Sequence, residues 1–191
     1  MGDSSEVEKT QAQQREETRA RLAKAATALK AQRDIATGLL TEDLSLAERV
    51  QALGFTEETA KVFDLLPVLH VAWADGEVQR PEREAIARVL EIRGVDEGSA
   101  GHLLITALIE KHPGQAYMEE TIAIIRELVT TNNRRAEALV DLCYVIAEAH
   151  GGGLFGFRDP IDASERRALN EVAEALGERA EMWLKAKFGE L

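Results

Sequence analysis

Acidic side chains cluster at two places in the sequence, each where an apolar run gives way to a charged segment. The first is "WADGEVQRPERE", residues 73–84, and the second is "DPIDASERR", residues 159–167. Carboxylate oxygens are the ligands that hard divalent cations such as Ca²⁺ and Mg²⁺ prefer. The acids of both segments are therefore candidate ligands for a divalent cation. They are Asp75, Glu77, Glu82, Asp159, Asp162 and Glu165.

The first segment matches only part of an EF-hand loop, which has oxygen ligands at positions 1, 3, 5, 7, 9 and 12 and glycine at position 6. With Gly76 at position 6, Asp75 takes position 5 and Glu82 takes position 12. Positions 1 and 3 are then Val71 and Trp73, whose side chains cannot ligate. A cation here would need water, main-chain carbonyls or an acid from the second segment.

The same acids also have a structural interpretation, as caps of helices. Asp75 is suited to accept amide hydrogen bonds inside its loop, and Gly76 to adopt a positive φ. Val78 is expected to anchor the loop in the core. Glu82 then lies in the first turn of the next helix, where the helix dipole favours a negative charge. An aspartate and a glutamate in the second segment allow the same capping arrangement, so both interpretations stay open.

Catalytic chemistry is the least favoured use of these acids. A general acid needs a desolvated carboxylate, and these acids lie among other charges, where no pattern predicts their burial. The sequence has no G-x-S-x-G, H-E-x-x-H or Walker motif, and its four histidines show no zinc-binding spacing. His70 is expected to be a hydrogen-bonded core histidine. We therefore predict no catalytic residues.

The elements that must position these acids are helices. After Thr56, apolar residues fill nearly every position of 65–73, which predicts a central helix buried on all sides, with Pro67 as a kink. An amphipathic helix with Ile92 on its apolar side should follow. Upstream, Ser45 with Glu48 predicts a capping box. Because no stretch alternates with period two, we expect an all-α fold of seven to eight helices.

The chain also repeats itself, with related helical hairpins predicted around residues 56–94 and 134–177. The second loop is longer by about eight residues, "GGGLFGFR", and its Phe155 and Phe157 either fill the core or form a partner-docking tip. The hairpins match at an offset of 83 residues. Matching pairs are Val78 with Ile161, Glu82 with Glu165, Arg83 with Arg166, Ile86 with Leu169, and Gly94 with Gly177.

Charge divides the chain into an arm and an acidic body. Residues 1–34 hold seven Lys/Arg and six Asp/Glu, a net charge of +1. Because the whole chain has a net charge of −11, the remaining residues have a net charge of −12. We expect residues 1–40 to form a charged arm, helical or partly disordered, and residues 41–191 to form one domain. The acidic body disfavours nucleic acid and favours a cation or a basic protein surface as its partner.

The lengths of the apolar stretches bear on whether the chain crosses a membrane. The longest apolar stretch, "LLPVLHVAWA", has about half of the roughly 20 residues that a membrane helix requires, which predicts no membrane span. The charged first residues do not resemble a signal peptide, so we expect a cytoplasmic location. The single Cys143 lies in an apolar run and is expected in the core.

The motif "ADGEV…PERE" after a buried helix, weakly repeated as "DPIDASERRAL", resembles the tellurite-resistance B (TerB-like) family, which also supplies the N-terminal domain of a membrane-anchored co-chaperone. The resemblance covers about residues 50–191. It implies a pseudo-two-fold, all-helical bundle whose loop acids bind a cation, in proteins linked to tellurite and other stress responses. The second loop departs from the family pattern, since it lacks D-G-x-I.

From the residues and the resemblance together we expect a non-enzymatic interaction or scaffold module in a bacterial stress or metal response. A divalent cation, Ca²⁺ or Mg²⁺, is the candidate ligand of the acidic loop, the other interpretation being helix caps with no cofactor, and a protein is the expected partner. One alternative is a cation-dependent sensor or switch. A hydrolytic enzyme that uses the loop carboxylates is the third.

Overall fold

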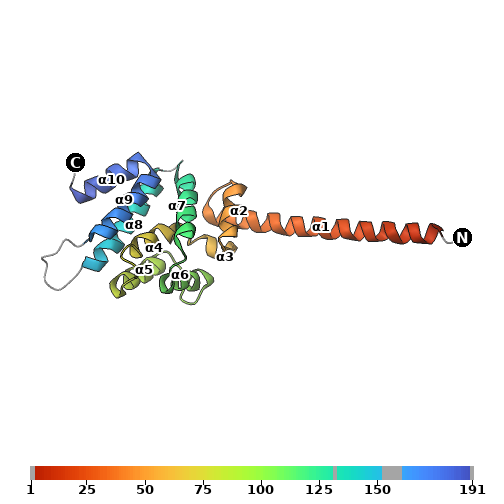
Figure 1. Ribbon diagram of the computed structural model, residues 1–191, viewed down its shortest axis with the longest axis horizontal. Helices are drawn as coiled ribbons and strands as arrows, with labels where there is room; N and C mark the ends of the chain where they lie inside the picture. Colours follow the sequence, from red (N-terminus) through yellow and green to blue (C-terminus); the bar gives the residue numbers. More distant parts are fainter. Residues whose placement is uncertain (1–2, 131–132, 152–160, 190–191) are drawn as a thin grey trace.

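A computed structural model describes residues 3–130, 133–151 and 161–189 of the chain, and side chains within residues 11–130, 135–149 and 161–189. The first element is a 37-residue helix, α1 (Asp3–Leu39), which projects from the body of the molecule as a straight arm (Figure 1). Side chains 11–30 of this helix are all exposed. The N-terminus lies at the tip of the arm and the C-terminus on the opposite side of the body (Figure 1).

The root of the arm is packed into the body. Ile35, Ala36 and Leu39 are buried, and α1 contacts α2 (Leu44–Ala52) and α3 (Glu57–Ala60). Gly38 permits the closest approach, because a Cβ at this position would lie 2.8 Å from the Cβ of Ala60. The last turn of the arm therefore belongs to the core.

The N-cap of α2 is Asp43, so the expectation that Ser45 caps this helix is wrong. Asp43 has extended backbone angles, and its Oδ1 accepts hydrogen bonds from the backbone N–H groups of Ser45, at 2.8 Å, and Leu46, at 3.4 Å. Ser45 already lies inside the helix. Arg49 then joins α2 to α7 (Gln115–Val129) through ion pairs of 2.7 Å to two glutamates of α7.

The central helix predicted to begin at Thr56 is not one kinked helix. The segment forms α3, a 3₁₀ turn η1 (Phe63–Leu65) and a short helix α4 (Leu66–Ala72), and the apolar run lies mainly in α4. Pro67 lies in the first turn of α4, where its missing N–H breaks no helical hydrogen bond. The chain therefore bends before Pro67 and not at it.

The first hairpin consists of α4 and α5 (Arg80–Ile92), and α6 (Ala100–Glu110) and α7 follow it. Val89 and Leu90 of α5 are buried. Ile92 was expected in the core but is 85% exposed, because it lies at the end of α5 on the side away from the core.

The second hairpin consists of α8 (Asn133–Gly151) and α9 (Ala163–Leu176), and α10 (Glu178–Phe188) packs against both of them. Leu184 of α10 is buried, Phe188 packs edge to face on Tyr144, and the Trp183 indole donates a 2.9 Å hydrogen bond to Asp141. This helix therefore closes one side of the core.

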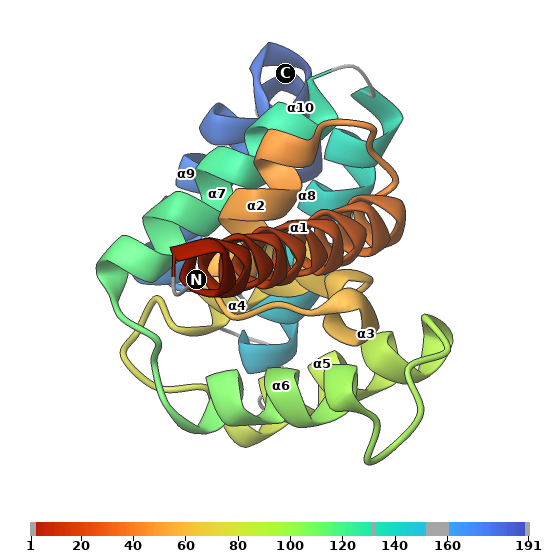
Figure 2. The ribbon, with the colours of Figure 1, turned by 90° about the vertical axis from the view of Figure 1, so that its right-hand side faces the viewer.

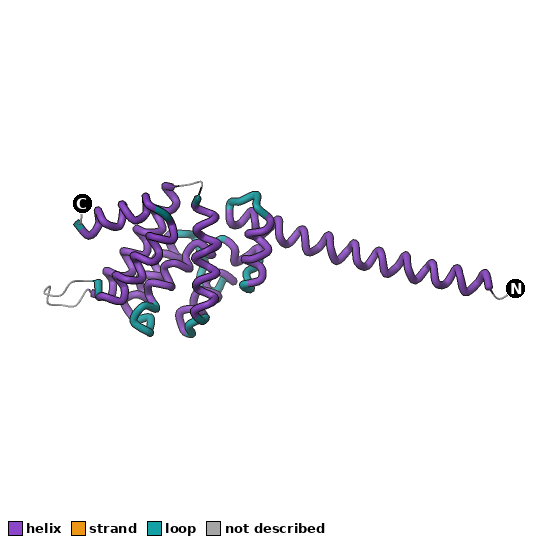
Figure 3. Tube along the Cα trace, turned by 45° about the horizontal axis from the view of Figure 1, so that its top comes forward, coloured by secondary structure: helices purple, strands orange, loops and turns teal. Residues whose placement is uncertain are grey.

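Within the described residues the protein is all-α, as predicted, with ten α-helices and no strand. The count exceeds the expected seven to eight partly because the central run divides. Figure 2 looks along the arm onto the body, with α10 at one end and α5 and α6 at the other. Figure 3 shows helices joined by short loops. One hydrophobic core runs through the body, with Phe55, Leu69, Ile105, Ile125 and Leu139 among its largest side chains.

Candidate functional site

The Asp75 loop between α4 and α5 is held by its own hydrogen bonds. Asp75 Oδ1 accepts the backbone N–H of Glu77 at 3.1 Å, and Oδ2 accepts the side-chain amide of Gln79 at 3.0 Å. Gly76 has φ +101°, and Val78 is buried. The structure thus shows the capping arrangement that the sequence allowed, with Asp75 and Glu77 themselves exposed.

Glu82 closes the N-terminus of α5. Its Oε2 accepts the backbone N–H of Gln79 at 2.7 Å, which is one half of a capping box. The side chain curls back beneath the loop, and the residue is only 1% exposed. The expectation that no loop acid would be buried is therefore wrong for Glu82.

The second hairpin repeats this geometry at the start of α9. Asp162 is the N-cap, and its Oδ1 accepts the N–H groups of Ser164, at 2.7 Å, and Glu165, at 2.9 Å. Glu165 Oε2 in turn accepts the Asp162 N–H at 2.8 Å, and Glu165 is 1% exposed. Both hairpins therefore carry a buried glutamate as the third residue of their second helix.

The acids of the two hairpins meet at one junction, which we name the acidic junction and define as Asp75, Glu82, Asp162 and Glu165. The pKa of Glu82 is raised to about 8, chiefly by burial and also by the charges of Glu165, Asp75 and Asp162, against the opposing effect of the Gln79 hydrogen bond. A carboxyl group with this pKa is mostly protonated at neutral pH. At neutral pH the acidic junction therefore has one negative charge fewer than its four carboxyl groups could carry.

The six predicted ligands are only partly brought together. Asp75, Glu82, Asp162 and Glu165 interact, Glu77 is exposed on the loop, and Asp159 lies outside the described residues. Among the described residues, no group of three or more His, Cys, Asp or Glu side chains is arranged to hold a metal ion. The donor chemistry suits Ca²⁺ or Mg²⁺, whereas the ligand geometry is not formed within the described part of the chain.

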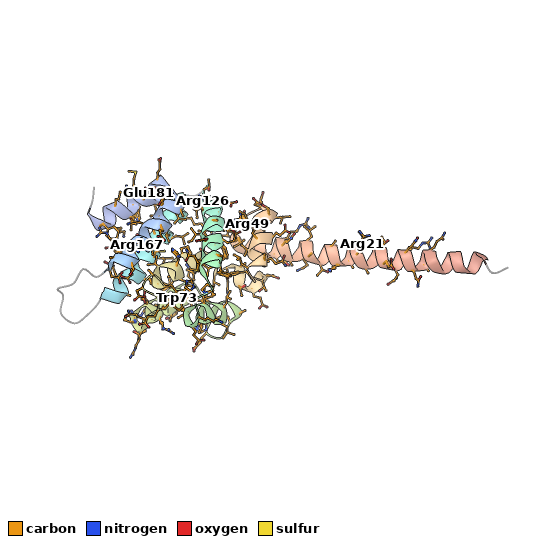
Figure 4. The ribbon with its side chains drawn as sticks, in the orientation of Figure 1. Arg21, Arg49, Trp73, Arg126, Arg167 and Glu181 are labelled. Atoms are coloured by element: carbon orange, nitrogen blue, oxygen red, sulfur yellow. The ribbon has the colours of Figure 1, made fainter. Side chains whose placement is uncertain are left out.

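The residues at EF-hand positions 1 and 3, Val71 and Trp73, have structural roles in the core and at its edge. Val71 is fully buried. The indole of Trp73, which is labelled in Figure 4, donates a 3.0 Å hydrogen bond to the carbonyl of Leu108, and its ring meets His112 edge to face. The loop therefore cannot act as a complete EF-hand.

A groove between α7 and α9 is a second feature, which the sequence did not indicate. It encloses about 450 Å³ and includes His70 of α4, whose Nε2 lies 3.3 Å from Glu171 Oε2. His70 was expected to be a hydrogen-bonded core histidine; its hydrogen-bond partner is Glu171, and its side chain, 16% exposed, lies at the edge of the core. The spacing of His70 and Glu171, far apart in sequence, gave no signal of this contact. The lining residues are His70, Gln115, Glu119, Ile122, Ala123, Arg126, Glu171, Val172 and Ala175.

Comparison with known protein families identifies the fold. The family model described as tellurite resistance protein TerB matches residues 65–187, well over half of the chain. The chain belongs to the TerB family. The match begins at the last residue of η1, directly before α4, and ends in α10, so it contains both hairpins and leaves the α1 arm outside. No curated protein and no solved structure matches the chain.

The TerB match covers both halves of the acidic junction. It includes Asp75 and Glu82 from the first hairpin and Asp162 and Glu165 from the second. No described helix of this TerB protein is both long enough and apolar enough to cross a membrane.

Proposed function

We propose that this TerB protein is a non-enzymatic interaction module of a bacterial tellurite or related stress response, and that it binds a divalent cation at the acidic junction. The observation that carries the proposal is the pair of glutamates, Glu82 and Glu165, buried next to each other's charge from two separate hairpins. Family membership supports the setting of the response.

Buried carboxylates of like charge require neutralisation. Removing a charge from water costs several kcal/mol per ion unless a proton or an opposite charge compensates it. A proton neutralises Glu82 at neutral pH, as its raised pKa indicates. A divalent cation would compensate more than one carboxylate at once, with oxygens of Glu82 and Glu165 as its buried ligands and those of Asp75 and Asp162 at its rim.

Glu82 keeps coordinating capacity beyond its cap. Its Oε2 accepts the backbone N–H of Gln79, and a carboxylate offers about four lone-pair positions on its two oxygens. Asp159, the one predicted ligand outside the described residues, precedes Ile161 by two residues in the sequence. We propose that this residue, main-chain carbonyls and water complete the coordination, since Ca²⁺ takes six to eight oxygen ligands.

The hydrolase alternative receives little support from the geometry. An acid with a raised pKa, Glu82, is present, but it does not line the groove between α7 and α9. The groove contains the exposed Glu171 beside His70. The group with the shifted pKa and the space for a substrate are therefore at different places.

Protein partners are proposed to dock through the segment of the sequence between α8 and α9. Phe155 and Phe157 of this segment lie outside the described residues, and their part in docking rests on the sequence, because aromatic side chains are frequent anchors of protein interfaces. Replacing both by serine should abolish partner binding and leave the melting temperature of the body unchanged.

Thermal melting of the metal-stripped protein tests the cation. We expect Ca²⁺ or Mg²⁺ to raise the melting temperature, by an amount equivalent to roughly 2.7 kcal/mol when the ion is at 100 times its dissociation constant. Glu82→Gln and Glu165→Gln should each remove this increase, and Glu91→Gln, an exposed glutamate on α5, is the matched control. Equal melting with and without Ca²⁺, Mg²⁺, Mn²⁺ and Zn²⁺ would leave the junction as a purely structural, proton-neutralised pair.

Spectroscopy separates a module with a structural ion from a sensor. If the cation also changes the tryptophan fluorescence or the hydrodynamic radius, the sensor alternative gains support. If only the stability changes, the ion is a structural component of the interaction module.

A further inference from the structure

The described side chains of the α1 arm are exposed over most of its length. This holds for all of residues 11–30, and the buried residues of α1 begin at Ile35. Helices gain most of their stability from packing an apolar face, and an isolated helix in water is marginal unless its sequence is very favourable. A helix exposed over 20 residues is therefore suited to packing against another molecule.

One face of the arm has the composition of a docking helix. Leu22, 66% exposed, and Leu29, 39% exposed, are seven residues apart and thus lie on the same side, with Ala25 and Ala26 between them. Arg19 precedes Leu22 by three residues and Arg33 follows Leu29 by four, so both cations flank this leucine face. We name the face defined by these six residues the leucine face.

The arm's charge is strongly positive around the leucine face. From residue 18 to residue 33 the chain has five Lys/Arg and no Asp/Glu. Figure 4 shows one of these cations, Arg21, on the arm well away from the body. The chain beyond residue 34 has 16 Lys/Arg and 28 Asp/Glu. The charges of arm and body are therefore complementary.

The groove between α7 and α9 has the complementary composition. Its apolar lining consists of Ile122, Ala123, Val172 and Ala175, and the two alanines leave space for larger side chains such as leucine. Glu119 on α7 and Glu171 on α9 add a carboxylate from each of the two helices, and both glutamates are exposed. A basic helix with two leucines is an occupant that this groove suits.

The root of the arm prevents a molecule from filling its own groove. Ile35, Ala36 and Leu39 are buried in the body, and α1 continues from there as one straight helix that leads away from it (Figure 1). The Arg135 guanidinium also donates a 3.2 Å hydrogen bond to the carbonyl of Leu39. Folding the arm back would require breaking the helix or this packing.

We propose that the leucine face of one molecule docks in the α7–α9 groove of a second copy of the same chain. Leu22 and Leu29 would enter the apolar part of the groove, while Arg19 and Arg33 pair with Glu119 and Glu171. The alternative self-contact, arm against arm, is disfavoured because the arginines that flank the leucines would face one another.

Arg126 is the one cation that lines the groove, and it provides an internal control (Figure 4). It would face the incoming arm with a like charge. Replacing Arg126 by glutamine should therefore strengthen self-association or leave it unchanged, whereas replacing a groove glutamate should weaken it.

Sedimentation velocity of the full-length chain over a range of concentrations and salt tests the proposal. We expect concentration-dependent self-association that weakens as salt increases, because exposed charge pairs are screened. The arm variant Arg19→Glu/Arg33→Glu and the groove variant Glu119→Arg/Glu171→Arg should each weaken it by on the order of tenfold or more. The control is Glu91→Arg/Glu97→Arg, which has the same charge change at exposed positions outside the groove.

Charge exchange makes the test independent of misfolding. A mixture of the arm variant and the groove variant should associate more strongly than either alone, since the acidic arm of one meets the basic groove of the other. A wild-type chain that stays monomeric overturns the proposal. So does association that survives both variants, or an arm that binds anionic vesicles or another protein while the chain itself stays monomeric.

Discussion

Glu82 and Glu165 occupy the same position in the two hairpins: each is the third residue of its helix, each accepts the backbone N–H three residues earlier, and each is 1% exposed. The two glutamates, one from each hairpin, also interact electrostatically. Because the two charges oppose each other, the charge state of one hairpin's glutamate affects the other hairpin. A change of pH near neutrality should therefore alter the charge of the acidic junction.

Stability in the absence of metal is expected to fall as pH rises through the titration of Glu82. The folded-state pKa of about 8 is above the ordinary 4.5, so the folded protein holds this proton more tightly than the unfolded chain does. The resulting stabilisation is complete below about pH 4.5 and is lost as pH rises through about 8. Urea denaturation in EDTA between pH 5 and pH 9 should show a loss on the order of a few kcal/mol.

Glu82→Gln isolates this contribution, because glutamine keeps an oxygen for the Gln79 N–H and does not titrate. We expect the free energy of unfolding of this variant to be nearly flat from pH 6 to pH 9. Glu91→Gln, at an exposed site, should retain the pH dependence of the wild type. A wild-type profile that rises between pH 6 and pH 9 would show that Glu82 is not the group that dominates.

Gly38→Ala should destabilise the root of the arm despite the better helix propensity of alanine. The added Cβ would lie 2.8 Å from the Cβ of Ala60, a contact too short for two carbons. We expect a loss of roughly 1–3 kcal/mol in chemical denaturation, as for other overpacked sites. The double variant Gly38→Ala/Ala60→Gly restores the space and should recover more stability than two independent changes would allow. If the stability changes of the two single variants simply add in the double variant, the close contact between residues 38 and 60 is not the cause of the destabilisation.

Gly76→Ala should destabilise the Asp75 loop by about 1 kcal/mol, since φ is +101° and alanine rarely adopts such an angle. No atom lies within 4 Å of the added Cβ, so the cost is conformational and not steric. Gly76→Asn should cost less, because asparagine tolerates positive φ better. Equal melting temperatures for the glycine and alanine proteins would indicate that the loop adopts another conformation in solution.

Cys143 should be unreactive in the folded protein. It is fully buried in α8, and burial raises the pKa of its thiol far above the usual range, which leaves almost no thiolate. Labelling with an aromatic disulfide reagent should follow global unfolding and reach completion only in denaturant. Rapid labelling of the native protein, at a rate independent of denaturant, would show local opening of α8.

Much of this fold was predictable because its signals are local. Continuous apolar residues around Leu69 and the absence of period-two patterns indicate buried helices, and the residue pairs at an offset of 83 indicate two hairpins. Pro67 and Ser45 were misassigned for local reasons as well. A proline fits the first turn of a helix as easily as a kink, and the Asp43 carboxylate caps a helix that the sequence also allowed to start two residues later.

The site was less predictable because burial of a charged residue is a tertiary property. Glu82 and Glu165 have the spacing of capping residues, which the sequence showed, but their burial depends on Val78 and Ile161 anchoring the two loops in one core. That shared spacing, an apolar anchor four residues before a glutamate in both hairpins, was the available signal. The groove beside His70 had none, since its walls come from three helices distant in sequence.

The packed root of α1 also fixes the rotational phase of the whole arm. Each residue of a helix turns the chain by about 100° and advances it by about 1.5 Å. One residue inserted between Leu29 and Ile35 would therefore swing the leucine face about a quarter turn around the arm axis while hardly changing its reach. Seven inserted residues would restore the direction of the face and carry it about 10 Å further from the body.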